Sequence, residues 1–523
     1  MSQRKPVQGR FSRRTLNIII LTTTVMIVLF YNIPGSRKPN QPIQSETTTL
    51  NDVESAALFA EAAPPVLTSL KIIESKQPKP HSIAIQSWNT PKGAKVLFVE
   101  SHEVPMLDVR LVLNAGAARD GDKPGIAYLV NSMLNEGTEN LSVDDIARKF
   151  EGLGASFSNG SYRDMAIASL RTLSDPRLSH EALSVFYEIV AKPSFPEENL
   201  SRIRDQILLS LQRDLQSPKA QISQAFNENL YGKNPYAHEE KGTPASLNAM
   251  TADDLKQFHD TFYVASNTVI AIVGDISQED AKTISGEVDQ WLARGNPAPR
   301  LPSPDQLKRP QTVAIDFPSN QSHIMVGALG IKRGDPRWYA LNVGNEILGG
   351  GGFSSRLNKV IRQDHGLAYS VYSFFSPMAV NGPFAMGLQT RNEESDKALA
   401  LLKETLTAFI KDGPTETEVT EAKKHILNSF PLSVASNSSI VDNLGAIGFY
   451  DLPLDYLDQY PRLVDKVTRA DIIAAFQSLI DPDKMLTIVL KPADNAPEAA
   501  QNEATQKATT GNKTAAPASS PAG

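Results

Sequence analysis

The chain has 523 residues, of which 41% are apolar and 21% charged, a balance typical of a globular protein large enough for more than one core. Its formal net charge of −6 gives no basis for nucleic-acid binding. The sequence contains no cysteine, which excludes thiol catalysis, disulfide frameworks and cysteine-based zinc sites.

The amino-terminal end predicts a membrane anchor. Five basic residues within the first fourteen positions precede an uncharged, largely apolar run over residues 16–33. About eighteen helical residues span roughly 27 Å, close to the hydrocarbon thickness of a bilayer. Basic residues before a span favour a cytoplasmic location for that end. We therefore expect residues 1–33 to form a cytoplasmic basic stub and an uncleaved transmembrane signal anchor, and a cleaved signal peptide is the alternative.

Composition divides the remainder of the chain. Residues 34–81 are rich in Ser, Thr, Pro and Glu and are expected to form a flexible tether. Residues 494–523 consist mainly of Ala, Thr, Asn, Pro and Gln, too polar to fold, and are expected to be a disordered tail. Between them lie two segments of similar size, residues 82–295 and 311–493, which a proline-rich linker at 296–310 separates.

These two segments have the pattern of repeats. Each contains a strand, a helix and a glycine-started hairpin, followed by an amphipathic helix, a proline break and another helix. Because strands and helices do not alternate regularly, an α+β layer fold is predicted. The strand, the hairpin start and the two helices fall at 107–113, Gly154, 182–190 and 197–212 in the first segment, and at 323–328, Gly366, 400–410 and 416–430 in the second.

The stretch over residues 125–138 reads GIAYLVNSMLNEGT and resembles the zinc helix of the pitrilysin/insulinase-like (M16) metallopeptidases, G-x-A-H-x-x-E-H-M-x-x-x-G-T. The two histidines and the glutamate of that pattern fall on Tyr128, Ser132 and Asn131. A phenol, a hydroxyl and an amide are poor zinc ligands, and none is a carboxylate base. The resemblance implies two homologous α+β domains that face each other like a clam shell over roughly residues 82–493.

The family's remaining zinc ligand is a glutamate on a later helix, which aligns with Leu209. An aliphatic side chain there predicts a filled, dry pocket in place of an ion site. The alternative is that this alignment is displaced by one helical turn and that the true ligands lie elsewhere in the sequence. We expect no metal and no cofactor in this chain, and the degenerate zinc-site positions are Tyr128, Asn131, Ser132 and Leu209.

None of the eight histidines stands in an H-x-x-E-H or H-E-x-x-H pattern. His238 lies in the stretch 234–243, which resembles a loop without catalytic duty in the family. We expect this stretch to be an ordinary surface loop.

The second half contains a glycine cluster at 349–352. It lacks the spacing of a phosphate-binding loop, which argues against a nucleotide role. The stretch 349–370 is instead similar to the M16 segment that supplies an arginine and a tyrosine, seven residues apart, to the active cleft, and Arg362 and Tyr369 match them. The resemblance implies that this pair reaches a zinc-bearing half and holds the substrate carbonyl as it gains negative charge. A structural arginine and a core tyrosine are the alternative, and Arg356 is assigned to structure.

Together these features predict a membrane-anchored, non-catalytic subunit that pairs with a zinc-bearing M16-like chain to degrade peptides or unfolded proteins. Zinc is expected in that partner, and this chain alone is expected to be inactive. The predicted location is the bacterial inner membrane, with the bulk of the chain in the periplasm. Extended peptides would bind at an exposed sheet edge. The alternatives are a structural or peptide-binding protein, like the M16-like core subunits of respiratory complexes, and a protease that uses other residues.

Overall fold

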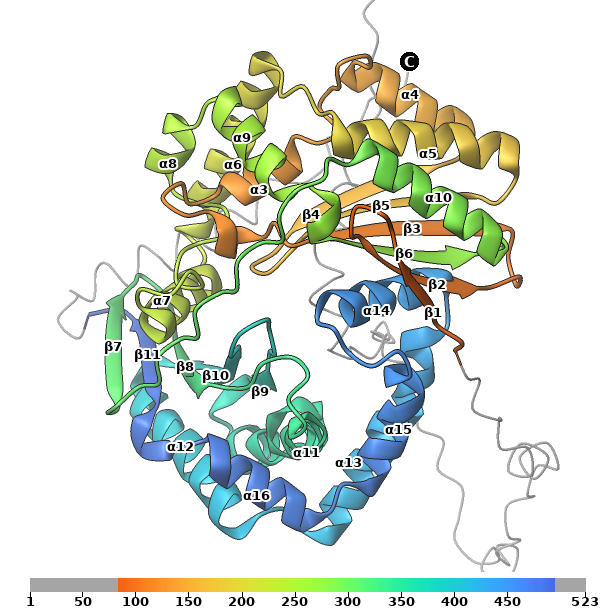
Figure 1. Cartoon of the computed structure of the whole chain (residues 1–523). Coiled ribbons are helices and arrows are strands. Elements are labelled where there is room, and N and C mark those ends of the chain that lie inside the picture. The colour runs from red at the N-terminus through yellow and green to blue at the C-terminus, as the bar shows by residue number, and fades with distance from the viewer. Residues whose placement is uncertain (1–82, 494–523) are drawn as a thin grey trace, which may run out of the picture. The chain divides into compact units, whose positions relative to one another are not determined.

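The computed structural model describes residues 83–493 (Figure 1). The predicted anchor, tether and tail lie outside this range. Among the residues described, none of the helices combines the length and the apolar character needed to cross a bilayer.

The first half is built on a six-stranded sheet with the order β1-β2-β6-β3-β5-β4. β2 runs parallel to β6, and the other neighbours are antiparallel. The predicted strand at 107–113 lies within β3, and the hairpin predicted from Gly154 is β4–β5, so both predictions are confirmed. The strands are β1 Gln86–Asn89, β2 Lys95–Glu100, β3 Met106–Leu113, β4 Ser156–Ser161, β5 Ala166–Leu173 and β6 Thr268–Gly274.

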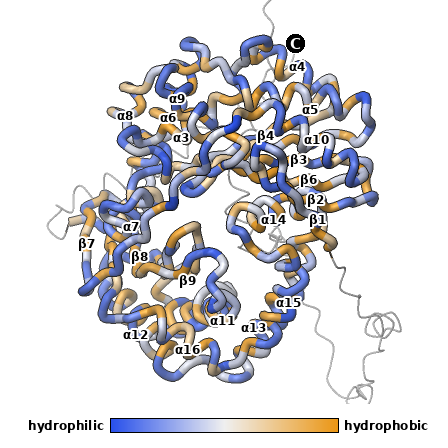
Figure 2. The backbone as a smooth tube through the Cα atoms, in the orientation of Figure 1, coloured by the Kyte–Doolittle hydropathy of each residue, from blue (hydrophilic) through white to orange (hydrophobic). Residues whose placement is uncertain are grey.

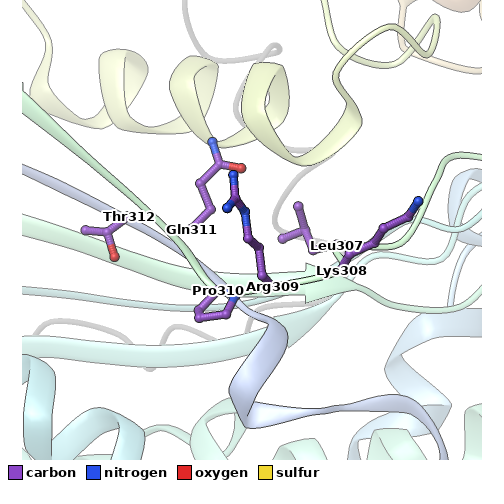
Figure 3. Close-up of a pocket in the computed structure, with 6 residues that line it drawn as sticks. All are labelled: Leu307, Lys308, Arg309, Pro310, Gln311 and Thr312. Atoms are coloured by element: carbon purple, nitrogen blue, oxygen red, sulfur yellow. The ribbon is translucent and has the colours of Figure 1, made fainter.

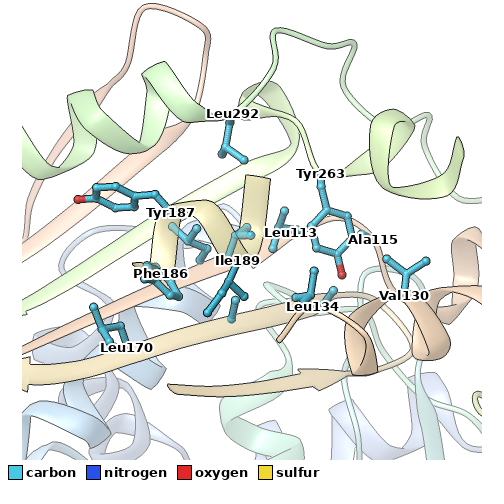
Figure 4. Packing of buried hydrophobic residues seen from close by; sticks show 14 of the residues in the cluster. Leu113, Ala115, Val130, Leu134, Leu170, Phe186, Tyr187, Ile189, Tyr263 and Leu292 are labelled. Carbon is cyan, nitrogen blue, oxygen red and sulfur yellow. The ribbon is translucent and has the colours of Figure 1, made fainter. Parts of the chain in front are cut away.

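Helices α4, α5 and α10 cover one face of this sheet (Figure 1). Phe186 and Ile189 of α5 pack with Leu113 and Leu170 of the strands beneath (Figure 4). Apolar and polar residues alternate along these helices, as expected where one side is buried (Figure 2). The helices of this half are α3 Ile126–Ser132, α4 Val143–Leu153, α5 Pro176–Ala191, α6 Glu197–Asp214, α7 Pro218–Tyr231, α8 Pro244–Ala249, α9 Ala252–Phe262 and α10 Gln278–Trp291.

The second half repeats this plan. Its sheet has the order β7-β11-β8-β10-β9, which corresponds to β2-β6-β3-β5-β4 of the first sheet, including the single parallel pair. The predicted repeat of two α+β units is therefore confirmed. The elements are β7 Gln311–Asp316, β8 Gln321–Leu329, α11 Trp338–Asn345, β9 Ala368–Phe375, β10 Pro383–Arg391, α12 Ser395–Asp412, α13 Glu416–Ser429, α14 Asn437–Phe449, α15 Tyr456–Lys466, α16 Arg469–Leu479 and β11 Leu486–Lys491.

Each half lends one helix to the sheet of the other. α7, from the first half, packs on β8 and β11, where a side chain added at Gly327 would come within 2.6 Å of the Phe226 ring. α14, from the second half, packs on β2, β3 and β6, where a side chain added at Gly448 would meet Leu97 at 2.8 Å. The missing side chains of these two glycines permit the close approach.

The segment predicted as the linker, residues 296–310, contains no helix or strand. Its end lines a pocket formed by residues 307–312 (Figure 3). The Gln311 side chain points toward α7 and donates a hydrogen bond from Nε2 to Asn229 Oδ1 at 2.9 Å. This contact fixes the beginning of β7 against the exchanged helix.

Candidate functional site

The helix that resembles a zinc helix begins against a buried carboxylate. Asp120 accepts hydrogen bonds from the backbone N–H groups of Gly125 at 2.6 Å and Ala127 at 3.0 Å, and its Oδ2 lies 2.9 Å from His238 Nε2. Burial raises the pKa of Asp120. Gly125 has φ +96°, and a side chain there would lie 2.6 Å from the Lys241 carbonyl oxygen. The loop that carries His238 therefore packs on the start of α3, and its prediction as an ordinary surface loop is wrong.

The three polar positions on α3 make hydrogen bonds within the protein. Asn131 is buried and donates from Nδ2 to the Ile167 carbonyl at 3.2 Å and to the Tyr263 hydroxyl at 3.4 Å. Ser132 Oγ donates to the Tyr128 carbonyl at 2.8 Å, within the helix. Burial raises the pKa of the Tyr128 phenol, which therefore stays protonated. None of the three groups is arranged as a metal ligand.

Leu209, the fourth position, lies on the exposed side of α6 with 48% of its surface accessible. The prediction of a filled, dry pocket at this residue is wrong. The buried side of α6 carries Ile203, Ile207 and Leu211, which follow the helical period. Position 209 falls between them in sequence and thus on another side of the helix.

A lysine lies where α3 approaches α6. Lys241 Nζ donates to Ser210 Oγ at 3.0 Å and to Asp214 Oδ2 at 2.6 Å, both on α6. Its positive charge opposes the rise that burial causes in the pKa of the nearby Tyr128 phenol. A fixed positive charge also disfavours the binding of a metal cation beside it. No group of three His, Cys, Asp or Glu side chains suited to a metal occurs within residues 83–493. The residues at the degenerate positions do not fit zinc.

β4 forms an open edge of the first sheet beside this helix. Among the strands of residues 83–493 it pairs only with β5, and Asn159 of β4 donates its side-chain amide to the Asn131 carbonyl of α3. Four of its six residues are Ser or Asn, so the edge is polar. Its unpaired backbone groups are available to an added strand.

The structure brings Arg362 and Tyr369 together. Arg362 lies on the helical segment Asn358–Asp364, and its guanidinium carbon is 4.9 Å from the centre of the Tyr369 ring. Tyr369, on β9, is 80% exposed and is therefore not a core tyrosine. Within residues 83–493, the guanidinium has no carboxylate partner. The use of this pair by a partner chain stays a prediction.

A third residue of this site, Phe353, received no role from the sequence. Its ring centre lies 4.7 Å from the Arg362 guanidinium carbon, and 64% of its surface is exposed. The sequence does contain a sign that Phe353 has a special role. It is a large aromatic residue in a stretch of glycines and serines, and burial in a core does not account for it.

The neighbouring glycines and Arg356 have structural roles. A side chain at Gly349 would come within 2.5 Å of the Ser373 amide on β9, so glycine allows this segment to lie directly against the strand. Arg356 donates to both carboxylate oxygens of Glu418, at 2.7 and 2.6 Å, and to the Gly413 carbonyl at 3.0 Å. These hydrogen bonds lower the pKa of Glu418 to about 2. The structural assignment of Arg356 is confirmed.

Comparison with known proteins agrees with the resemblance. The family model "Insulinase (Peptidase family M16)" matches residues 95–243, and the model "Peptidase M16 inactive domain" matches residues 249–426. The crystal structure of a peptidase M16 inactive domain from Pseudomonas fluorescens is 44% identical, with a TM-score of 0.76, and covers 79% of this chain and 99% of its own.

Two curated relatives are more distant. The non-peptidase homolog YmxG of Helicobacter pylori is 29% identical over 391 residues, which cover 72% of this chain and 87% of the relative. The uncharacterized zinc protease YmxG of Bacillus subtilis is 23% identical, and the match covers 79% of this chain and 100% of the relative. With two consecutive M16 domains, a zinc site whose ligands are absent and a 44% identical relative, the chain belongs to peptidase family M16 and resembles its non-peptidase members.

Proposed function

We propose that this chain is a non-catalytic M16 subunit that pairs with a zinc-bearing M16 chain and supplies Arg362 and Tyr369 to the peptide-cleaving site of that partner. One observation carries the proposal. The four zinc-site positions hold residues unsuited to a metal, whereas Arg362 and Tyr369 remain in contact, with Tyr369 largely exposed and Arg362 half-buried.

The chemistry of the pair suits a developing oxyanion. Aromatic rings hold a guanidinium through its π-face and leave its N–H donors free. The Tyr369 hydroxyl adds a further donor. Zinc in the partner would polarise the substrate carbonyl, and hydrogen bonds from Arg362 and Tyr369 would stabilise the charge that develops on its oxygen. Such a preorganised donor contributes about 10²–10³ in rate in other enzymes.

The open edge of β4 supports extended peptides as the substrate class. A peptide that adds as a strand to this edge would form main-chain hydrogen bonds with little sequence preference. The polar side chains of β4 offer no deep apolar pocket that would select one residue type. Peptides and unfolded proteins of varied sequence would therefore be accepted.

The proposal extends to location. The apolar run at 16–33 would anchor the chain in the bacterial inner membrane, and the M16 domains would lie in the periplasm with the partner. Labelling of the full chain with a membrane-impermeant reagent in intact and permeabilised cells tests this orientation. Labelling of the M16 domains only after the inner membrane is opened would contradict it.

The central test uses the detergent-solubilised full chain and the M16 chain that co-purifies with it. The isolated chain should contain no stoichiometric zinc by elemental analysis and cleave no peptide, whereas the mixture should be active. Arg362→Ala should lower the kcat of the mixture by about 10²-fold, and the exposed Arg391→Ala, also in the second half, should leave it unchanged. Stoichiometric zinc in the isolated chain would overturn the proposal. A purely structural or peptide-binding role predicts equal kcat for both variants.

A further inference from the structure

The Arg362 guanidinium contacts two aromatic rings. Its carbon lies 4.7 Å from the ring centre of Phe353 and 4.9 Å from that of Tyr369. Both rings are largely exposed, so neither owes its position to a hydrophobic core. A phenylalanine that is 64% exposed gains little from burial, and its contact with the cation is its principal described interaction.

The turn that carries Phe353 is fixed to the segment that carries Arg362. Gln363, the residue after Arg362, donates from Nε2 to the Phe353 carbonyl at 2.9 Å. Within the turn, Ser354 Oγ donates to the Gly351 carbonyl at 2.9 Å and Ser355 Oγ to the Gly352 carbonyl at 2.7 Å. These hydrogen bonds tie the turn that carries Phe353 to the segment that carries Arg362.

This arrangement orients a cation without neutralising it. A carboxylate partner would also hold the guanidinium, but it would occupy the N–H donors and cancel the charge. An aromatic ring contacts the π-face of the guanidinium and leaves both its N–H donors and its positive charge available. For an arginine that must meet a developing negative charge, the second kind of support preserves the electrostatic effect.

We infer that Phe353 is a positioning residue that holds the Arg362 guanidinium in the orientation used at the partner's site. The inference rests on the proposed function, because the kinetic role of Phe353 requires that of Arg362. Phe353 itself need not touch the substrate.

The first test needs only the isolated full chain. Phenylglyoxal modifies accessible guanidinium groups, and its rate at Arg362 can be followed by peptide mass spectrometry. Phe353→Leu should raise this rate about three- to fivefold, since an exposed cation–π contact is lost. Phe353→Tyr should leave it unchanged, as should Leu432→Ala, which removes an exposed apolar side chain elsewhere in the second half. An unchanged rate at Arg362 in Phe353→Leu would overturn the inference.

The second test uses the complex with the partner. Phe353→Leu should lower kcat about three- to fivefold without changing KM, and Phe353→Tyr should restore it. In the Arg362→Ala background, Phe353→Leu should have no further effect, because the two residues act as one unit. If Arg362→Ala lowers kcat but Phe353→Leu does not, the inference fails and the proposed function stands. If neither variant lowers kcat, the proposed function itself fails.

Discussion

The ammonium of Lys241 lies 2.6 Å from the carboxylate of Asp214. This ion pair joins α6 to the loop over residues 234–243, which packs on the start of α3. The family resemblance places the zinc ligands of active members on the counterparts of these two helices. In this chain a lysine of the loop that packs on the start of α3 pairs with an aspartate of α6, and this ion pair needs no metal ion.

Lys241→Met should therefore destabilise the protein. Loss of a partly solvent-screened pair with an additional hydrogen bond to Ser210 should lower the free energy of unfolding by about 1 kcal/mol. Urea unfolding measures the change. Lys149→Met, which removes a more exposed pair with Glu181, is the matched control and should cost less than about 0.5 kcal/mol. An excess of Zn²⁺ should leave the Tm of the wild-type chain unchanged, and a zinc-dependent rise would contradict this account.

The start of α3 should tolerate no side chain at position 125. Gly125→Ala combines a left-handed backbone with an approach to the Lys241 carbonyl and should cost about 2–3 kcal/mol in the free energy of unfolding. Gly121→Ala is the control, because Gly121 also has positive φ, at +61°, but open space around it. It should cost about 1 kcal/mol. Equal losses in the two variants would show that the packing of the loop on α3 has no energetic effect.

In the family pattern, the positions of Asn131 and Leu209 hold glutamates. Restoring a glutamate at each position should affect stability differently. Leu209→Glu places a charge on an exposed side of α6 and should change stability by less than about 0.5 kcal/mol. Asn131→Glu places a carboxylate among buried groups and should cost at least about 3 kcal/mol. Thermal unfolding of the two single variants distinguishes these outcomes, and a large loss for Leu209→Glu would mean that its side chain is buried in solution.

Acid should weaken the second half through Glu418. Hydrogen bonds from Arg356 lower the pKa of Glu418 from 4.5 to about 2, so the folded state favours the ionised carboxylate. This contribution is fully present above pH 4.5 and is lost as the pH falls toward 2. The free energy of unfolding should therefore decline less steeply between these pH values in Glu418→Gln than in the wild type. Glu404→Gln, on an exposed position of α12, should follow the wild-type curve.

Much of the fold was accessible from local patterns. Helical periodicity, proline breaks and glycine-started hairpins are set by neighbouring residues, and they predicted the repeated unit in the correct order. The exchange of α7 and α14 was not predicted. An apolar stripe, such as that containing Phe226, shows that a helix is buried but not which sheet covers it.

The candidate site was predictable to a similar degree. The spacing of Arg362 and Tyr369 located a pair that lies in contact, and the zinc-helix pattern correctly placed Tyr128, Asn131 and Ser132 on one helix. The exposure of Leu209 does not follow from its residue type but from helical phase, because Ile203, Ile207 and Leu211 mark the buried side of α6. The contact between Phe353 and Arg362 could not be predicted, because the position of the Phe353 ring depends on a turn whose conformation no local pattern specifies.

The mutual insertion of α7 and α14 makes residues 83–493 a single folding entity despite their two repeats. A fragment ending at the proline-rich connector would retain α7 without the strands that cover it and would expose the apolar surface around Leu97 that α14 protects. Such a piece should aggregate when produced alone. The two complementary fragments, synthesised together, should reassemble into a soluble complex, because each carries the helix that shields the other.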